Sequence, residues 1–223
     1  MPRSVHVSGS SDGLRGALEE RLERAGAELV DEPEKAEVTI QIDSPESSDI
    51  AIVPLGSSSP GSGIVIELSD VIIPNGGKKW GNGVITDWIE KIMSGKKPDS
   101  EPNIRFWVNV RDVVDAISTI CLNGKEKIPN GNYTMCGRRA WEMADVTDEI
   151  RVLWERYNNS INHSHTIESL SKVPSPVRGL HSRIEERPDL TKIHEALVMA
   201  GGDGWHPLVP MRVSLMEMIA SAK

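Results

Sequence analysis

Three things are scarce in this 223-residue sequence: cysteine, aromatic residues other than tryptophan, and long apolar runs. Two cysteines, Cys121 and Cys136, are too few for a disulfide-stapled secreted domain, and we expect both to be reduced thiols. No stretch reaches the roughly 18 consecutive apolar residues of a membrane-spanning helix, and the first residues lack the apolar segment of a signal peptide. We therefore expect a soluble, cytoplasmic protein with no membrane partner.

Positive charge is also in deficit, because 25 Lys and Arg residues face 33 Asp and Glu residues, for a net charge of −8. A chain with no basic field does not attract phosphate backbones, so a nucleic-acid partner is excluded. His163 and His165 could bind a metal from one strand, but no cysteine or carboxylate stands beside them, and we expect a solvated pair and no metal site. A small molecule or a protein remains as the partner.

The first 31 residues have the pattern of a strand, a glycine-rich turn, a helix and a second strand. Glycines in such a turn let the backbone approach a pyrophosphate, and the helix N-terminus offers free amides. An acidic residue after the second strand is where an adenosine ribose would be bound. The alternative is a tight turn with no ligand. The candidate cofactor-binding residues are Gly9, Ser10, Ser11, Gly13, Gly16 and Asp31.

Three further strands are predicted at 37–43, 50–56 and 64–73, and no helix fits between them. Parallel neighbours normally need a crossover of a dozen or more residues. Either these strands include antiparallel pairs, or short loops replace crossover helices. The seam between the last two strands, LGSSSPGSG (55–63), is the clearest such place.

The second half predicts a helix at 84–95, a strand at 104–110, and a helix that Asp112 caps. A strand at 132–137, a long helix at 141–158 and two terminal helices follow. We expect an α/β fold, Rossmann-like, with a mostly parallel sheet, deleted crossover helices and a small C-terminal α/β lobe. The predicted division is a reduced Rossmann-like domain at 1–140 and a lobe-like segment at 141–223, interleaved with 70–103 and forming one compact unit.

Several segments resemble, in the right order, the extended short-chain dehydrogenases/reductases, the NAD-dependent epimerase/dehydratases that modify nucleotide sugars. They are the N-terminal strand–turn–helix unit, IRFWVNVRDVVDAI (104–117), NGNYTMCGRRAWEMADVTDEI (130–150) and ERPDLTKIHEAL with GWHP (186–197, 204–207). The resemblance implies a nucleotide or nucleotide-sugar ligand and makes NAD a candidate cofactor. The glycine turn departs from the family by one extra residue between its first two glycines.

The seam lies where the family carries its catalytic Tyr-x-x-x-Lys helix. That helix is missing, because the only tyrosines, Tyr133 and Tyr157, have no lysine four residues on. Without the tyrosine, general base catalysis worth about 10²–10⁴-fold is lost. No catalytic residue can therefore be assigned; Ser57 and Ser58 in the seam and Asp70 after it are weak candidates.

Two arginines match positions that lie near the nucleotide diphosphate in the family, and Arg105 and Arg187 are therefore candidate substrate-binding residues. Salt bridges are the equally weighted alternative for both. Glu67 stands where the family has an arginine, which is unfavourable beside a diphosphate.

The strand patterns give one polar sheet face, because Thr39, Gln41 and Glu67 alternate with apolar residues. In the family, the lost helices cover this face and pair two subunits. We expect the uncovered face to bind a protein partner or a second copy of the chain, with Val53, Leu55 and Val65 as its apolar part.

The leading hypothesis is a catalytically degenerate epimerase/dehydratase-like protein that binds a nucleotide, dinucleotide or nucleotide sugar. One alternative is an active enzyme that uses a partner chain or another base, namely Asp12, Asp70, His163 or His165. The other is a structural subunit paired with a full-length homologue.

Overall fold

The computed structural model describes residues 3–99, 104–168 and 188–222. Its main sheet has six strands in the order β2-β1-β3-β4-β5-β8, and every neighbouring pair is parallel. The strands are β1 (Ser4–Gly9), β2 (Glu28–Leu29), β3 (Val38–Ile42), β4 (Ile50–Pro54), β5 (Ile64–Leu68) and β8 (Gly131–Met135). The predicted Rossmann-like α/β fold is confirmed, and short loops rather than antiparallel pairing account for the missing helices.

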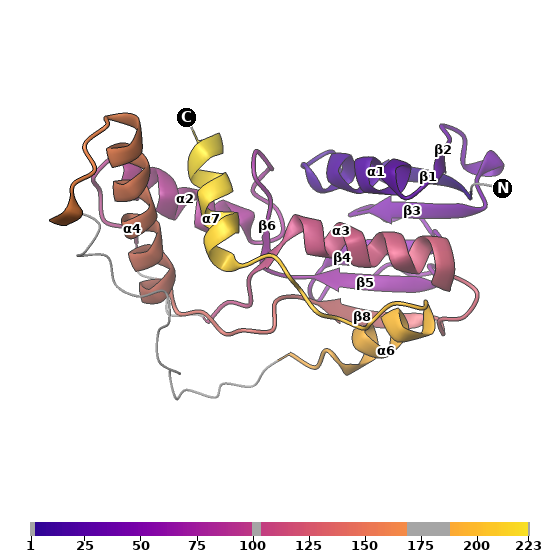
Figure 1. The fold of residues 1–223 in the computed structure, drawn as a ribbon. Helices are drawn as coiled ribbons and strands as arrows, with labels where there is room; N and C mark the ends of the chain where they lie inside the picture. The colour runs from indigo at the N-terminus through magenta and orange to yellow at the C-terminus, as the bar shows by residue number, and fades with distance from the viewer. Residues whose placement is uncertain (1–2, 100–103, 169–187, 223) are drawn as a thin grey trace.

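Helices cover one face of this sheet (Figure 1). They are α1 (Leu14–Arg24), α3 (Val110–Thr119) with its π-helical continuation η2 (Ile120–Gly124), and α6 (Thr191–Met199). Alternate strand residues such as Ile40, Ile52 and Ile66 point toward them and are fully buried in one continuous core. The three buried leucines of α1 recur every four residues, which gives that helix its apolar stripe.

Two short connections cross the opposite face, and we call them strap 1 (43–49, between β3 and β4) and strap 2 (55–63, between β4 and β5). On strap 1, the Glu46 carboxylate accepts a hydrogen bond of 2.7 Å from the Gln41 side-chain amide. The straps also bond to each other, since Ser48 N donates to the Ser62 hydroxyl at 3.1 Å and Gly63 N to Ser48 O at 3.1 Å. A chain that joins parallel neighbours must return across the sheet, and here it does so without a helix.

The expectation of an uncovered, partly apolar face is therefore wrong. Val53 and Val65 are only 3% and 5% exposed, and together with Ala51 they form a small separate cluster. Leu55, at 52%, is the exposed member of the predicted apolar set. This small cluster packs beneath the straps, and Gln41 and Glu67 on the same face are polar.

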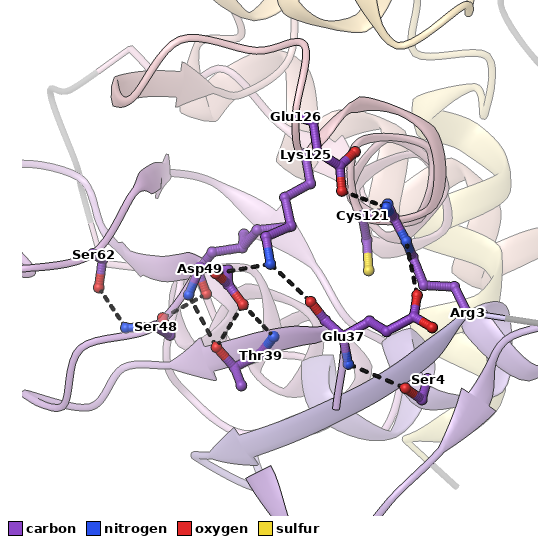
Figure 2. A network of polar contacts seen from close by, with 11 residues as sticks. Arg3, Ser4, Glu37, Thr39, Ser48, Asp49, Ser62, Cys121, Lys125 and Glu126 are labelled. Atoms are coloured by element: carbon purple, nitrogen blue, oxygen red, sulfur yellow. Dashed lines mark hydrogen bonds and ion pairs between the residues drawn. The ribbon is translucent and has the colours of Figure 1, made fainter. Parts of the chain in front are cut away.

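A polar network fastens strap 1 at the sheet edge where the strands begin (Figure 2). The Asp49 carboxylate accepts hydrogen bonds from Thr39 N at 2.8 Å and from the Thr39 hydroxyl at 3.0 Å, and it pairs with Lys125 Nζ at 2.9 Å. Lys125 also donates to Glu37 O at 2.7 Å. Arg3 bonds to the carbonyl of Cys121 at 2.8 Å, which ties the start of β1 to η2.

A second lobe lies beyond the other ends of the strands (Figure 1) and contains α2 (Asn82–Met93), α4 (Met143–Ile161) and α7 (Met211–Ser221). It has its own core, which includes Ile85, Trp88, Ile150 and Leu215. A parallel pair, β6 (Val71–Ile72) and β7 (Val108–Asn109), connects it to the sheet. The C-terminal segment is shared between the cores, because α6 packs on the main sheet and α4 and α7 on the lobe. The division at residue 140 stays a prediction.

Asp112 does not cap α3 as predicted. The N-cap is Asn109, whose side-chain oxygen accepts from Arg111 N at 2.8 Å. The Asp112 carboxylate instead accepts from Leu208 N at 2.9 Å and Val209 N at 3.1 Å, so it fixes the segment that leads to α7. Within the described residues, no helix is long and apolar enough to cross a membrane.

Candidate functional site

The glycine-rich turn lies between β1 and α1, at the edge where the parallel strands end. Gly9 has φ +98°, and a Cβ there would lie 2.1 Å from Ile42 O. Ser10 N donates to that same carbonyl at 2.8 Å. Gly13, with φ +96°, is the residue before α1, whereas Gly16 lies exposed inside α1 with nothing within 4 Å of an added Cβ. The fold itself requires the first two glycines but gives no packing reason for the third.

The segment that follows β6, residues 74–81, lies directly on this turn. Gly77 N donates to Asp12 O at 2.9 Å, and a Cβ on Gly13 would be 3.0 Å from the Gly76 Cα. Lys79 Nζ donates to the Ser10 hydroxyl at 3.1 Å and forms an ion pair with Asp43 at the end of β3. We call residues 76–80 the cover segment.

Asp12 occupies the N-terminus of α1. One of its carboxylate oxygens accepts from Leu14 N at 3.4 Å, and the other accepts from Trp80 Nε1 at 2.6 Å. A helix N-terminus attracts negative charge, and here a side chain of the protein supplies that charge. Trp80 is only 5% exposed, so the indole that holds Asp12 is itself firmly packed.

A dinucleotide bound at this turn would meet the Asp12 carboxylate. A pyrophosphate at this place would take hydrogen bonds from the first amides of α1. The Leu14 amide already faces Asp12, whose carboxylate would repel the phosphates. Of the other predicted cofactor residues, Ser11 and Asp31 are exposed, and Asp31 follows β2 beside β1. A bound dinucleotide would require the cover segment and Asp12 to move.

Asp70 and Arg105, predicted as a weak catalytic candidate and a substrate-binding residue, contact each other. Arg105 Nη1 lies 3.0 Å from Asp70 Oδ1, and Phe106 N donates to Asp70 Oδ2 at 2.8 Å. Asp70 is 6% exposed and has φ +54°. A buried carboxylate that holds a guanidinium and a backbone amide fixes the approach of β6 to the 104–107 segment. Arg105 thus forms a salt bridge, and its role in substrate binding stays a prediction.

Ser57 and Ser58 lie exposed on strap 2, and Ser59 is buried, with its hydroxyl 3.0 Å from that of Ser62. Strap 2 contains no helix, as predicted for the seam. His163 and His165 are exposed just beyond α4. Arg187 lies outside the described residues.

Lys79 and Trp80 are the residues of this site that sequence reasoning missed. The Trp80–Asp12 hydrogen bond joins positions 68 apart, and the Lys79–Ser10 bond joins positions 69 apart. A local sequence pattern cannot predict a contact between residues so far apart in the chain. The one signal is the GGKKWG segment itself, whose two lysines follow two glycines in an acidic chain.

Comparison with known proteins gives structural likeness only. No protein-family model matches the sequence, and no curated protein matches it. The Bordetella bronchiseptica enzyme WbmF, solved in complex with NADH, has 13% identity and a TM-score of 0.63, over 99% of this chain and 91% of that chain. RMD from Pseudomonas aeruginosa, complexed with NADPH, has 12% identity and a TM-score of 0.61, over 99% and 97%.

A third neighbour is the dTDP-glucose 4,6-dehydratase of Bacillus anthracis, solved in complex with NAD. It has 12% identity and a TM-score of 0.59, over 99% of this chain and 96% of that chain. The TM-scores establish the fold, and identities of 12–13% leave the activity open. The chain therefore has the Rossmann fold of these NAD(P)-bound structures, which confirms the fold that its resemblance to the extended short-chain dehydrogenases/reductases implies.

Proposed function

We propose that the protein is a catalytically degenerate relative of nucleotide-sugar epimerases and dehydratases, which binds a nucleotide or nucleotide sugar without NAD-dependent hydride transfer. Strap 2 is the observation that carries this proposal. It joins β4 to β5 through residues 55–63, with no helix at the place where the resembled family carries its catalytic tyrosine and lysine.

Neither tyrosine is suited to replace the missing base. Removal of hydride from a sugar carbon requires a group of lowered pKa to accept the hydroxyl proton. Burial instead raises the pKa of Tyr133, whose hydroxyl donates to Pro129 O at 2.5 Å on the helix-covered side of the sheet. Tyr157 stacks on Trp154 within α4, with 5.9 Å between the ring centroids.

The acidic candidates are held in structural bonds. Asp12 is bonded to Trp80 and Asp70 to Arg105, so each carboxylate stabilises a neighbouring segment of the chain. His163 and His165 lie in the lobe, beyond the end of α4. The segment that contacts the glycine turn is instead the cover segment, through the Gly77–Asp12 hydrogen bond.

Support for a nucleotide ligand comes from the neighbouring structures. WbmF was also solved with NAD+ and UDP together, so this fold accommodates a nucleotide apart from the dinucleotide. Because Asp12 and the cover segment occupy the glycine turn, we expect a mononucleotide or nucleotide sugar rather than NAD as the ligand.

Two measurements test the proposal. The protein is incubated with NAD+ and with UDP-, GDP- or dTDP-sugars, and the sugars are analysed by chromatography while cofactor reduction is followed by absorbance. We expect no conversion; sugar conversion that depends on protein concentration and NAD+ would refute the loss of hydride transfer. Thermal unfolding with UDP, GDP or dTDP tests binding: a ligand at 100 times its Kd adds about 2.7 kcal/mol, or roughly 5–10 °C in Tm.

A further inference from the structure

A cleft lies apart from the glycine turn, between the segment after β8 and the segment that enters α7. It has a volume of about 520 Å³, within the range of small-molecule sites. The Gly137 amide donates to Phe106 O at 2.7 Å, and a Cβ at this position would lie 2.1 Å from Trp107 O. Only glycine allows this close approach, which carries Arg138 and Arg139 into the wall of the cleft.

Positive charge gathers in this cleft although the chain as a whole is acidic. Three arginines and one glutamate line it: Arg138, Arg139, Arg212 and Glu149. Arg212 Nε pairs with Glu149 at 2.5 Å, and both of these side chains are mostly covered. The two exposed arginines leave a local surplus of positive charge, which attracts an anion.

Planar and apolar groups complete the walls. The Arg139 guanidinium lies 4.2 Å from the centroid of the Trp141 ring, and Pro207 and Pro210 line the cleft as well. Trp107, which is 6% exposed, also lines it, and its Nε1 is buried without a hydrogen-bond partner among the described residues. The cleft therefore offers two guanidinium groups, one of them held over an indole ring, between apolar walls.

A nucleoside phosphate matches this combination. A guanidinium group binds phosphate oxygens through paired N–H groups, and a guanidinium plane that lies on an indole can stack on a flat base. The first amides of α7, which begins at Met211 in the cleft, add a favourable dipole for the anion. None of the lining residues belongs to the glycine turn or to the Asp70–Arg105 pair.

We propose that this arginine cleft binds the nucleoside 5′-phosphate part of the ligand, with Arg138 on the phosphates and the base stacked on the Arg139 guanidinium, which lies over the Trp141 ring. The inference rests on the proposed function, because it assigns the nucleotide-binding site. An acidic peptide would also be attracted by the arginines but has no flat base to stack on the Arg139 guanidinium.

The test uses isothermal titration of the full chain with UDP, and then with pyrophosphate and uridine separately. The double variant Arg138→Ala/Arg139→Ala removes the proposed phosphate contact and the proposed base contact from an exposed surface. Arg151→Ala is the matched control, because Arg151 is an exposed arginine of α4 that pairs with Asp148. We expect UDP affinity to fall at least tenfold in the double variant and to stay unchanged in the control, with uridine and pyrophosphate each binding more weakly than UDP.

Other outcomes overturn the inference in distinguishable ways. If UDP binds but the double variant retains the wild-type Kd, the cleft is not the site while nucleotide binding stands. Loss of binding in Lys79→Ala would then locate the ligand at the glycine turn. If pyrophosphate binds as tightly as UDP, the cleft recognises anions without a base. If UDP, GDP and dTDP all fail to bind, both the inference and the nucleotide-binding part of the proposed function fall. Hydride transfer, in contrast, bears on the proposed function alone.

Discussion

Asp49 attaches strap 1 to the start of β3. Its replacement tests whether these polar bonds stabilise a connection that has no crossover helix. Its carboxylate accepts two hydrogen bonds from Thr39 and pairs with Lys125. In Asp49→Ala, the Thr39 amide loses its acceptor and strap 1 loses its attachment to the start of β3. The variant should fold, because the apolar core on the helix-covered face is untouched.

The size of the effect follows from these contacts. A hydrogen bond to a charged group contributes about 1.5–3 kcal/mol when it is buried. The Asp49 side chain is 33% exposed, so solvent screens the Lys125 pair and water can reach part of the site. We therefore expect a loss of about 2–3 kcal/mol for Asp49→Ala, which lowers Tm by roughly 4–12 °C. Asp49→Asn keeps an acceptor for Thr39 and should lose about 1 kcal/mol.

The pH dependence gives a second readout. Partial burial raises the pKa of Asp49, but hydrogen bonds from Thr39 and Lys125 outweigh it and hold the pKa below its ordinary value near 3.8. A lowered pKa in the folded state stabilises the protein above the unfolded pKa, and this contribution is lost as the pH falls through the folded pKa. The Tm difference between wild type and Asp49→Asn should therefore be constant near neutral pH and shrink below about pH 4. Equal Tm values for wild type and Asp49→Ala at pH 7 would refute the role of this network.

Three further predictions concern the glycine turn and the thiols. Trp80→Phe removes the donor that holds Asp12, and NADH fluorescence titration should show tighter binding than in wild type; equal affinity would mean that the cover segment does not restrict the turn. Gly9→Ala should prevent native folding, seen as lost near-ultraviolet circular dichroism, because its Cβ would lie 2.1 Å from a backbone oxygen. Burial raises the pKa of the Cys121 and Cys136 thiols to about 12, so neither should react with a thiol reagent at pH 8 until denaturant is added.

The sequence pattern predicted which strand residues share a face of the sheet, but it did not predict whether neighbouring strands are parallel or antiparallel. Thr39 and Gln41 alternate with apolar residues such as Ile40, and this period of two correctly separates the strap face from the helix-covered face. Seven to nine residues can close a hairpin or cross a narrow sheet, so the loop lengths left parallel and antiparallel order equally open. The order depends on contacts made by distant elements such as α3 and β8.

The candidate site shows the same division between local and distant information. Gly9 and Gly13 were predicted from a local motif, and both adopt the backbone conformation that such a turn requires. The contacts of the turn also depend on Trp80 and Lys79, which belong to the segment after β6 and bond to Asp12 and Ser10. The prediction of Asp112 as a cap was wrong for a related reason. Asn109 is the N-cap, and the Asp112 carboxylate accepts hydrogen bonds from backbone amides almost a hundred residues away.

The polar residues of the strap face indicate that the chain is built around its short connections. Had helices simply been removed from a sheet that still expected them, apolar side chains would remain exposed there. Instead Gln41 bonds to Glu46 of strap 1, and Glu67 accepts from the Gly56 amide of strap 2 at 3.1 Å. Glu67 also accepts from the Asn132 side chain at 2.9 Å, across the β5–β8 pair. A sheet face whose polar side chains bond to the straps is therefore an alternative to a helix-covered one.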